Sequence, residues 1–271
     1  MEEAQLEWCR QALDALKTKT HDQAIAEYND LRIIEAKELL QNLGDHPYCK
    51  AATRVELHGV RDTTGFVNAN FIRHKALSGG PTAICAGNPD APDRFWEMIV
   101  QQRCRAIVKL TAECYADYFP SRPGEFENFG DIRVTNKSLQ HSRFGVSKRV
   151  LEVESPGHEA FGVEHFQYSW TDFGVPRLVE PVLEIFKELY KLQPGCSYVV
   201  HCRAGIGRSG TFITIDHILR RIQSGDLSAV SVADVVQYLR QQRGGLVETS
   251  EQYWFCFRAI IKQLECFLAQ K

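Results

Sequence analysis

The stretch "VVHCRAGIGRSGTF", Val199 to Phe212, decides how this sequence is interpreted. The apolar run at 197–202 predicts a short buried strand, and the apolar stripe along 208–223 predicts a helix. Gly205 and Gly207 lie between them, and glycine allows backbone conformations that other residues resist. The stretch therefore predicts a strand, a tight loop and a helix in direct succession.

The predicted loop has the chemistry of an anion site. Successive backbone N–H groups of such a loop can point inward, and the positive end of the following helix points to the same place. Arg208 can direct two N–H donors onto a tetrahedral oxyanion. Cys202 would lie at the floor of this site, where the positive surroundings favour a thiolate near neutral pH. A thiolate beneath a bound dianion predicts nucleophilic attack on phosphorus.

Two other interpretations of the loop are weaker. A buried structural cysteine beside a glycine turn would not require the full pattern His-Cys-x-x-Gly-x-Gly-Arg-Ser. A nucleotide-binding loop would carry Gly-Lys-Ser/Thr or Gly-x-Gly-x-x-Gly, and this stretch has neither.

Composition excludes several classes of partner. The chain has 271 residues, 44% of them hydrophobic and 24% charged, which is typical of a globular protein with a substantial core. A net charge of -2 gives no global attraction to nucleic acid or to an anionic membrane. No apolar run approaches the ~20 residues that span a bilayer, and the N-terminus is acidic and amphipathic, unlike a signal peptide. We therefore expect neither nucleic acid nor a membrane segment.

The cysteines indicate a reducing compartment. There are nine, dispersed and without a Cys-x-x-Cys pair. This usage favours reduced thiols in the cytoplasm over a disulfide framework. No cluster of His, Cys and Asp suggests a metal site, so we expect no metal and no cofactor.

Hydrophobic patterning predicts an α/β fold with a twisted mixed sheet flanked by helices on both sides. We expect one domain over 1–271, with two amphipathic helices within 1–43 packed on it, and a monomer. Ser231 is expected to cap a helix that stops at Gly244 and Gly245. The other expected elements are strands near 53–57, 65–72, 82–87, 105–111 and 197–202, antiparallel strands within 125–170, and helices at 92–102, 179–192, 208–223 and 250–268.

The loop resembles the signature loop of the cysteine-dependent protein tyrosine phosphatases. "WTDFGVP", 170–176, is similar to that family's mobile acid loop, and "VVQYLRQQRGGLVETSEQYWF" is similar to its glutamine-bearing region. Further matches, from "ATRVEL" to "AIVKLT", extend the resemblance over about 40–258, and they match the tyrosine-specific branch. The resemblance implies a cytoplasmic signalling enzyme without a cofactor that hydrolyses phosphotyrosine in proteins through a cysteinyl-phosphate.

The resemblance also implies roles for individual residues. Cys202 would be the nucleophile, Arg208 the phosphate clamp, and Asp172 the general acid and later the base. Ser209 would hydrogen-bond the thiolate, and His201 would tune the loop. The substrate-binding residues would be Arg203, Ala204, Gly205, Ile206, Gly207, Phe173, Glu248 and Gln252.

The sequence departs from the family pattern at several positions. Thr171 replaces the proline of Trp-Pro-Asp, which removes a fixed φ and adds an N–H. Gly44 stands where the family has the tyrosine that stacks on the substrate ring, and Tyr48 is close enough to replace it if the loop shifts. Glu248 stands where the family has a water-positioning glutamine, whereas Gln252 matches the second one. In addition, His46 stands where an aspartate usually holds the peptide backbone, and Glu113 would be the acidic partner of Arg208.

These departures leave alternatives open. The chain could bind phosphotyrosine without efficient turnover, although Cys202, Arg208 and Asp172 are all present. It could also act on phosphoinositides or phosphoserine. A lipid substrate would favour a wide basic rim, and the variable loop positions offer one base, Arg203.

Overall fold

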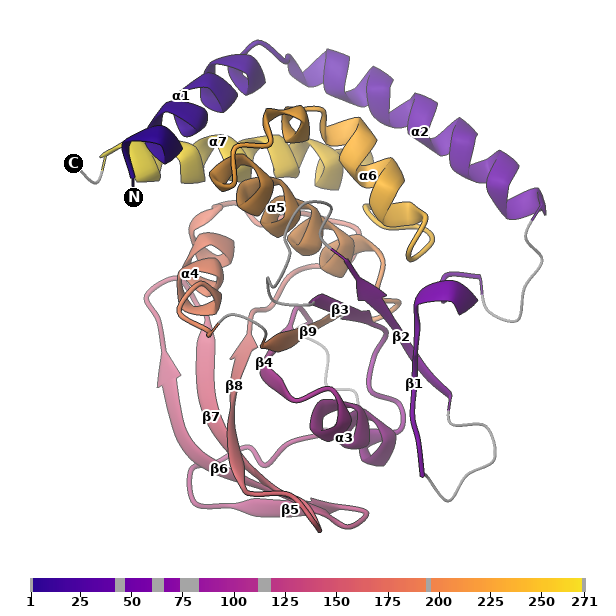
Figure 1. The fold of residues 1–271 in the computed structure, drawn as a ribbon, viewed down its shortest axis with the longest axis vertical. Helices are drawn as coiled ribbons and strands as arrows, with labels where there is room; N and C mark the ends of the chain where they lie inside the picture. The colour runs from indigo at the N-terminus through magenta and orange to yellow at the C-terminus, as the bar shows by residue number, and fades with distance from the viewer. Residues whose placement is uncertain are drawn as a thin grey trace.

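A single nine-stranded sheet organises the molecule, in the order β1-β2-β3-β9-β4-β8-β7-β6-β5 (Figure 1). The computed structural model describes residues 2–41, 47–59, 66–73, 83–111, 118–193 and 196–269. β3, β9, β4 and β8 are mutually parallel, and the flanking pairs are antiparallel, so the sheet is mixed as predicted. The strands are β1 Arg54–Glu56, β2 Phe66–Ile72, β3 Ala83–Ala86, β4 Cys104–Lys109, β5 Phe126–Phe129, β6 Ile132–His141, β7 Ser147–Glu154, β8 Phe161–Gln167 and β9 Ser197–His201.

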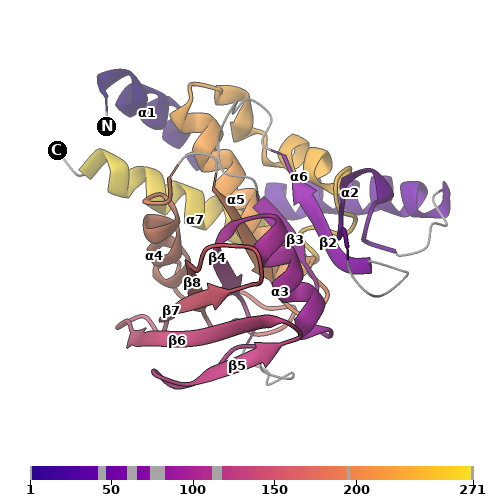
Figure 2. The same ribbon diagram turned by 60° about the horizontal axis from the view of Figure 1, so that its bottom comes forward.

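Helices lie on both faces of the sheet (Figures 1 and 2). α3 covers one face, where Trp96, Phe95 and Ile99 join a buried cluster with strand residues. The other face carries a larger cluster built around α5, with α4 and α7 packed beside it. The helices are α1 Glu3–Lys17, α2 His21–Gln41, α3 Pro92–Gln101, α4 Glu180–Leu189, α5 Gly207–Gln223, α6 Val232–Arg240 and α7 Ser250–Ala269; two short 3₁₀ helices span Ala51–Thr53 and Leu227–Val230.

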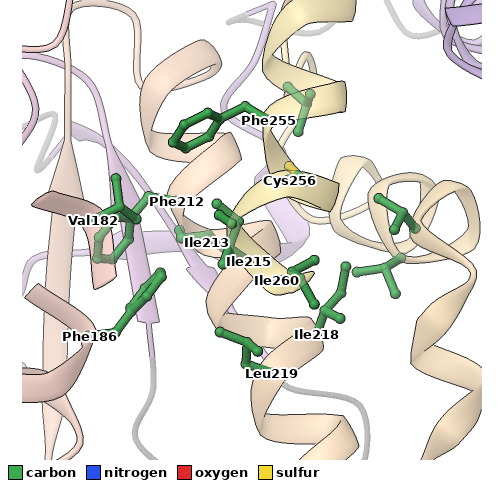
Figure 3. Packing of buried hydrophobic residues seen from close by; sticks show 14 of the residues in the cluster. Val182, Phe186, Phe212, Ile213, Ile215, Ile218, Leu219, Phe255, Cys256 and Ile260 are labelled. Atoms are coloured by element: carbon green, nitrogen blue, oxygen red, sulfur yellow. The ribbon is translucent and has the colours of Figure 1, made fainter. Parts of the chain in front are cut away.

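The core on the α5 face is apolar and continuous. Phe212, Ile213 and Ile215 of α5 lie between Phe186 of α4 and Cys256 of α7 (Figure 3). Burying such side chains stabilises a fold by roughly 1.5–3 kcal/mol each. This packing holds α5, and with it the loop before it, in a fixed position relative to the sheet.

α1 and α2 pack on the C-terminal helices. Cys9, Leu13 and Leu16 of α1 join the cluster of α5 and α7. From α2, the Tyr28 hydroxyl donates to the Val247 carbonyl oxygen at 3.3 Å, and Glu27 accepts a hydrogen bond from the Tyr253 hydroxyl at 2.6 Å. The N-terminal helices thus support the segment that precedes α7.

One expectation about the helix ends is wrong. α6 ends at Arg240 with Gln241 as its C-cap, so it does not reach Gly244. Ser231 does occupy the N-cap position, but its side chain makes no capping hydrogen bond. Gly244 and Gly245 instead lie against Pro47 and Tyr48, where a side chain on either glycine would crowd its neighbours.

The parallel strands place the candidate site. Because β3, β9, β4 and β8 run in the same direction, their carboxyl ends meet at one edge, where ligands bind in open α/β sheets. Cys202 directly follows β9, Trp170 follows β8 by three residues, and Gly87 follows β3. Among the described helices, none is both long and apolar enough to cross a membrane.

Candidate active site

The loop from Cys202 to Arg208 is held by hydrogen bonds to its carbonyl groups. The carbonyl oxygen of Arg203 accepts from the Asn88 N–H at 2.9 Å, and that of Ile206 accepts from the Val247 N–H at 3.1 Å. The Arg243 guanidinium donates to the carbonyl oxygens of Ala204 and Gly205 at 3.0 and 2.7 Å. Because the N–H of a trans peptide points opposite to its carbonyl, these bonds turn the loop amides toward the loop centre.

Arg243 is a site-supporting residue that sequence reasoning missed. It is fully buried, and it also donates to Asn70 Oδ1 at 2.7 Å and Asn68 Oδ1 at 2.9 Å on β2. Its only signal in the sequence is an arginine before the glycine pair of "QQRGG". The sequence does not show that this arginine folds back onto a loop almost 40 residues away.

The two glycines of the loop are required for different reasons. Gly205 has φ +69°, and a Cβ on it would overlap the Ala86 carbonyl oxygen. Gly207 lies under the glutamine-bearing region: a Cβ there would come within 2.7 Å of Glu248 Oε2 and 3.0 Å of Gln252 Nε2. Gly205 therefore allows the turn of the backbone, and Gly207 allows two polar side chains to approach it.

Cys202 lies at the base of the loop with 2% of its surface exposed. A second cysteine, Cys85 of β3, packs beneath the loop and its Sγ contacts the Gly205 carbonyl oxygen at 3.3 Å. Burial raises the pKa of Cys85 to about 12, so Cys85 remains a neutral thiol. All eight cysteines in the described part of the chain are free, and the predicted reducing compartment stays a prediction.

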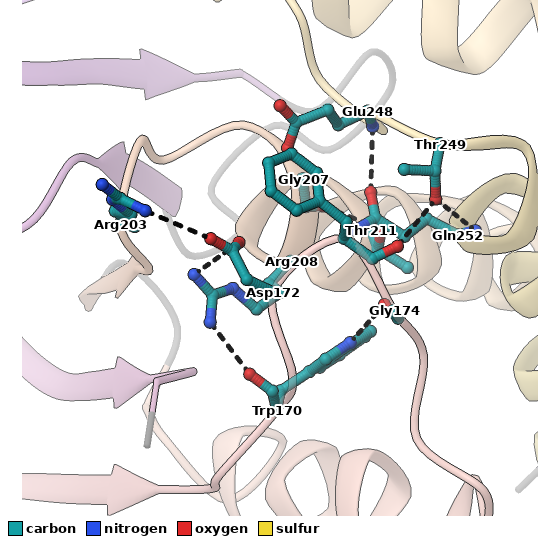
Figure 4. Close-up of polar contacts among 11 residues, drawn as sticks. Trp170, Asp172, Gly174, Arg203, Gly207, Arg208, Thr211, Glu248, Thr249 and Gln252 are labelled. Atoms are coloured by element: carbon teal, nitrogen blue, oxygen red, sulfur yellow. Dashed lines mark hydrogen bonds and ion pairs between the residues drawn. The ribbon is translucent and has the colours of Figure 1, made fainter. Parts of the chain in front are cut away.

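Arg208 connects the loop to the acid loop. Its Nη2 lies 2.8 Å from Asp172 Oδ1, and its Nη1 donates to the Trp170 carbonyl oxygen at 2.9 Å (Figure 4). Arg203, 63% exposed at the rim, places its Nη1 3.8 Å from Asp172 Oδ2. Arg208 is buried, and its Nε has no hydrogen-bond partner among the described residues. The structure thus places Asp172 against Arg208, at the end of the loop that begins with Cys202.

The acid loop is folded over the signature loop without the proline of the family pattern. The Trp170 indole N–H donates to the Gly174 carbonyl oxygen at 2.8 Å, which closes the turn containing Thr171. Thr249 Oγ1 donates to the Phe173 carbonyl oxygen at 3.3 Å from the opposite side (Figure 4). Phe173 has φ 58° and is 59% exposed, so its ring is available at the mouth of the site. Thr249 was not predicted, and its contact depends on the folded loop.

Glu248 and Gln252 lie on the other side of the loop. The Glu248 N–H donates to Gln252 Oε1 at 2.9 Å, which leaves Gln252 Nε2 buried and without a hydrogen-bond partner in the described structure. Burial, and then the nearby charge of Asp172, raise the pKa of Glu248. Both predicted residues therefore reach the loop, and one offers an unused donor.

The remaining predicted residues have mixed outcomes. Ser209 is fully buried in the first turn of α5, and no described residue hydrogen-bonds its Oγ. Ala204, Gly205, Ile206 and Gly207 form the loop itself. Gly44, His46 and Glu113 lie outside the described residues, so the roles expected of them stay predictions.

Tyr48 lies beside the loop. Its ring atoms come within 3.2 and 3.3 Å of the point where a Cβ on Gly245 would sit, and Ile206 Cδ1 comes within 3.4 Å of the same point. An aromatic ring and a loop side chain of the site are therefore neighbours, although Tyr48 is four residues beyond the position where the family has its tyrosine.

His201, the residue before Cys202, is buried and neutral. Its Nε2 lies 2.7 Å from the Tyr118 hydroxyl, which also contacts His165 Nε2 at 2.9 Å. Burial, helped by the positive charge of Lys109, lowers the pKa of His201 to about 3. Tyr118, which sequence reasoning missed, contacts His201, and the tuning of the loop by His201 stays a prediction. In the described part of the chain, no group of three or more His, Cys, Asp and Glu side chains could hold a metal ion.

Comparison with known proteins identifies the family. The model of the protein-tyrosine phosphatase family matches residues 41–262. The chain belongs to the protein-tyrosine phosphatase family. It is 37% identical over 228 residues to Protein-tyrosine-phosphatase PTP1 of Arabidopsis thaliana, which covers 78% of this chain and 66% of that protein. It is 32% identical over 231 residues to Tyrosine-protein phosphatase 69D of Drosophila melanogaster, covering 77% of this chain and 15% of that one.

Non-receptor phosphatases are also among the relatives. Human Tyrosine-protein phosphatase non-receptor type 20 is 28% identical over 230 residues, covering 80% of this chain and 53% of that protein. The chain thus spans from about one seventh to about two thirds of the length of these phosphatases. The family match confirms the resemblance and the α/β fold that were predicted from the sequence.

Proposed function

We propose that this chain hydrolyses phosphotyrosine in proteins through a cysteinyl-phosphate intermediate. One observation carries the proposal: Asp172 lies 2.8 Å from Arg208, the last residue of the loop that begins with Cys202. A nucleophile, an anion clamp and an acid are the three groups that such a reaction needs. The relatives named as tyrosine phosphatases support the same chemistry.

In the first step, the Cys202 thiolate attacks phosphorus and the bond from phosphorus to the phenolic oxygen breaks. Protonated Asp172 gives its proton to the leaving oxygen, so a neutral tyrosine hydroxyl is released. The inward amides and Arg208 hold the equatorial oxygens, whose charge is spread in the transition state.

In the second step, a water attacks phosphorus and the bond from sulfur to phosphorus breaks. Asp172, now a carboxylate, takes one proton of the water, and the thiolate leaves with the bonding electrons. Gln252 Nε2, an unused donor beside Gly207, is suitably placed to orient the water or the phosphoryl group. Ser209 Oγ makes no hydrogen bond to Cys202 in the described structure, and in this proposal it donates to the thiolate only as the sulfur leaves phosphorus.

Substrate class follows from the depth and lining of the site. The nucleophile is 2% exposed, and a long aryl group reaches such a floor more easily than the short side chain of phosphoserine. Phe173, Ala204 and Ile206 would line the aryl group, and Arg203 is the base at the rim. Phosphotyrosine proteins are therefore the proposed partners, ahead of phosphoinositides.

The test is hydrolysis of an aryl phosphate and of matched phosphotyrosine and phosphoserine peptides, with a phosphoinositide as a further substrate. We expect turnover of the aryl phosphate and the phosphotyrosine peptide, loss of it in Cys202→Ser, and a stable substrate complex in Asp172→Ala. Tight phosphotyrosine binding without turnover would instead identify a binding module. Trapping with Asp172→Ala from a lysate, read by mass spectrometry, would identify the substrate protein.

A cytoplasmic signalling role and a monomeric state complete the proposal. The free cysteines support a reducing compartment. Fractionation of the full-length protein and its mass in solution would test these two points.

A further inference from the structure

Glu248 lies directly against the loop of the proposed phosphate site, at Gly207. Its Oε2 is 2.7 Å from the point where a Cβ on Gly207 would sit, and Gln252 Nε2 is 3.0 Å from the same point. The carboxyl group therefore covers the loop beside an unused amide donor. It is only partly accessible to solvent.

The charges around Glu248 come from three elements. Asp172 faces it from the acid loop and Arg208 from α5, while Arg32 and Glu35 lie toward it from α2. Arg208 is already committed to Asp172 and Trp170. Glu248 thus lies among charges of both signs, and Arg208, one of these two arginines, is already paired with another carboxylate.

A phosphate dianion in this site meets more anionic side chains than the two guanidinium groups of Arg208 and Arg203 can neutralise. The Cys202 thiolate, Asp172 and Glu248 would present three anions beside it, and like charges at such short range repel strongly in a partly dry site. Protonation of Asp172, which the first chemical step requires, removes one of these charges. The carboxyl group of Glu248, which lies against Gly207, is the next charge that can be neutralised.

We propose that Glu248 binds substrate as the neutral acid, so that phosphate binding takes up one proton at this residue. This inference rests on the proposed function. A protonated carboxyl has one O–H donor and an acceptor oxygen, as the amide of glutamine has N–H donors and an acceptor oxygen. The O–H donates to a phosphoryl oxygen, and the other oxygen accepts from the attacking water.

The proton on Glu248 is not transferred in either chemical step. Asp172 alone exchanges a proton with the leaving phenol and with water, and Glu248 returns its proton to solvent when inorganic phosphate leaves. Burial and the Asp172 charge already raise the pKa of this carboxyl before substrate arrives, and a bound dianion acts in the same direction.

The test is calorimetry on two non-hydrolysing proteins, Cys202→Ser and Cys202→Ser with Glu248→Gln, each titrated with one phosphotyrosine peptide. Measuring the binding enthalpy in buffers with different ionisation enthalpies gives the number of protons taken up. Near pH 7.5 we expect the protein that retains Glu248 to take up about one more proton than the protein that carries Glu248→Gln. The affinity of the protein that retains Glu248 should also fall up to about tenfold more per pH unit above pH 7.5.

The matched pair isolates Glu248 when both proteins also carry Asp172→Asn, because position 172 is then uncharged in both and the peptide phosphate contributes equally. Equal proton uptake and parallel pH dependences would overturn the inference while leaving the proposed function intact. Failure of both proteins to bind the phosphotyrosine peptide would overturn the proposed function, and the inference with it. As a second readout, Glu248→Gln in the active enzyme should flatten the KM rise above neutral pH.

Discussion

The two ends of α5 carry the same kind of ion pair in different settings. At the start of the helix, Arg208 pairs with Asp172, which belongs to another loop and is 24% exposed. Near its end, Arg220 pairs with Asp216 one turn earlier in the same helix, at 2.9 Å, and Asp216 is fully buried.

The neighbours of each pair explain the difference. Asp216 also accepts from the Tyr198 hydroxyl of β9 at 2.7 Å, and the Arg220 guanidinium lies 4.6 Å from the centre of the Tyr190 ring. Each arginine keeps a buried nitrogen without a hydrogen-bond partner in the described structure, Nε in Arg208 and Nη2 in Arg220, so the two pairs differ in what holds the carboxylate. An ion pair between two residues of one helix stabilises the fold. In an ion pair between a helix and a loop, the arginine can exchange the carboxylate for a bound ligand.

Breaking the pair at the start of the helix should have the largest effect. Arg208→Lys retains the charge but loses the planar fork, and we expect a fall in kcat of ~10³-fold or more. The urea midpoint should stay close to that of the parent protein, because Asp172 belongs to a loop and is partly exposed. Steady-state kinetics and urea unfolding measure the two quantities; retained activity would contradict the role of Arg208.

Breaking the pair near the end of the helix should reduce stability and leave activity almost unchanged. Asp216→Asn leaves the Arg220 charge without its carboxylate, and we expect a loss of about 3–5 kcal/mol in the free energy of unfolding. The folded fraction should keep its kcat within about twofold. Tyr198→Phe, which removes one hydrogen bond, is the milder control at about 1 kcal/mol. A loss of kcat comparable with that of Arg208→Lys would remove the distinction between the two ends.

Acid should add to the comparison, because His201 ends β9, the strand that leads through the loop into α5. Its pKa is about 3 in the folded chain and about 6.5 when unfolded. Between these values the unfolded state binds the extra proton, so stability is lost as the pH falls below about 6.5. The loss from His201 should reach about 2 kcal/mol at pH 5.

Urea unfolding at pH 7.5 and pH 5 measures this loss, with His201→Gln as the matched variant. His201→Gln should be less stable at pH 7.5, because the contact with Tyr118 changes, but it should lose less on acidification. The same pH dependence in both proteins would show that His201 does not titrate as its burial requires.

The smallest expected effect concerns the aromatic wall of the site. Tyr48 lies beside Ile206 and Gly245, and Tyr48→Ala should weaken phosphotyrosine peptide binding by roughly 0.5–1.5 kcal/mol if its ring meets the substrate ring. Gly44→Tyr, at the position of the family tyrosine, should strengthen binding by a similar amount. Peptide titration of the Cys202→Ser protein measures both; an unchanged affinity in Tyr48→Ala would place the ring outside the pocket.

The sequence predicted most elements because their signals are local. The run 208–223 has an apolar stripe, the run 197–202 is short and apolar, and the observed α5 and β9 agree with them within one residue. The prediction failed at Gly244, where glycine was taken as the end of a helix. There the glycine pair serves the contact with Pro47 and Tyr48, which no local pattern reveals.

By itself, the sequence determined the strand, the glycine turn and the helix that bring Cys202 and Arg208 to one loop, because these residues are close along the chain. Only the tertiary structure decided which carboxylate faces Arg208, that Arg243 turns the loop carbonyls outward, and that Glu248 lies on Gly207. Those contacts join segments far apart in the sequence. They depend on the parallel order of β3, β9, β4 and β8 and on the packing of α5, which place the loops at one edge of the sheet.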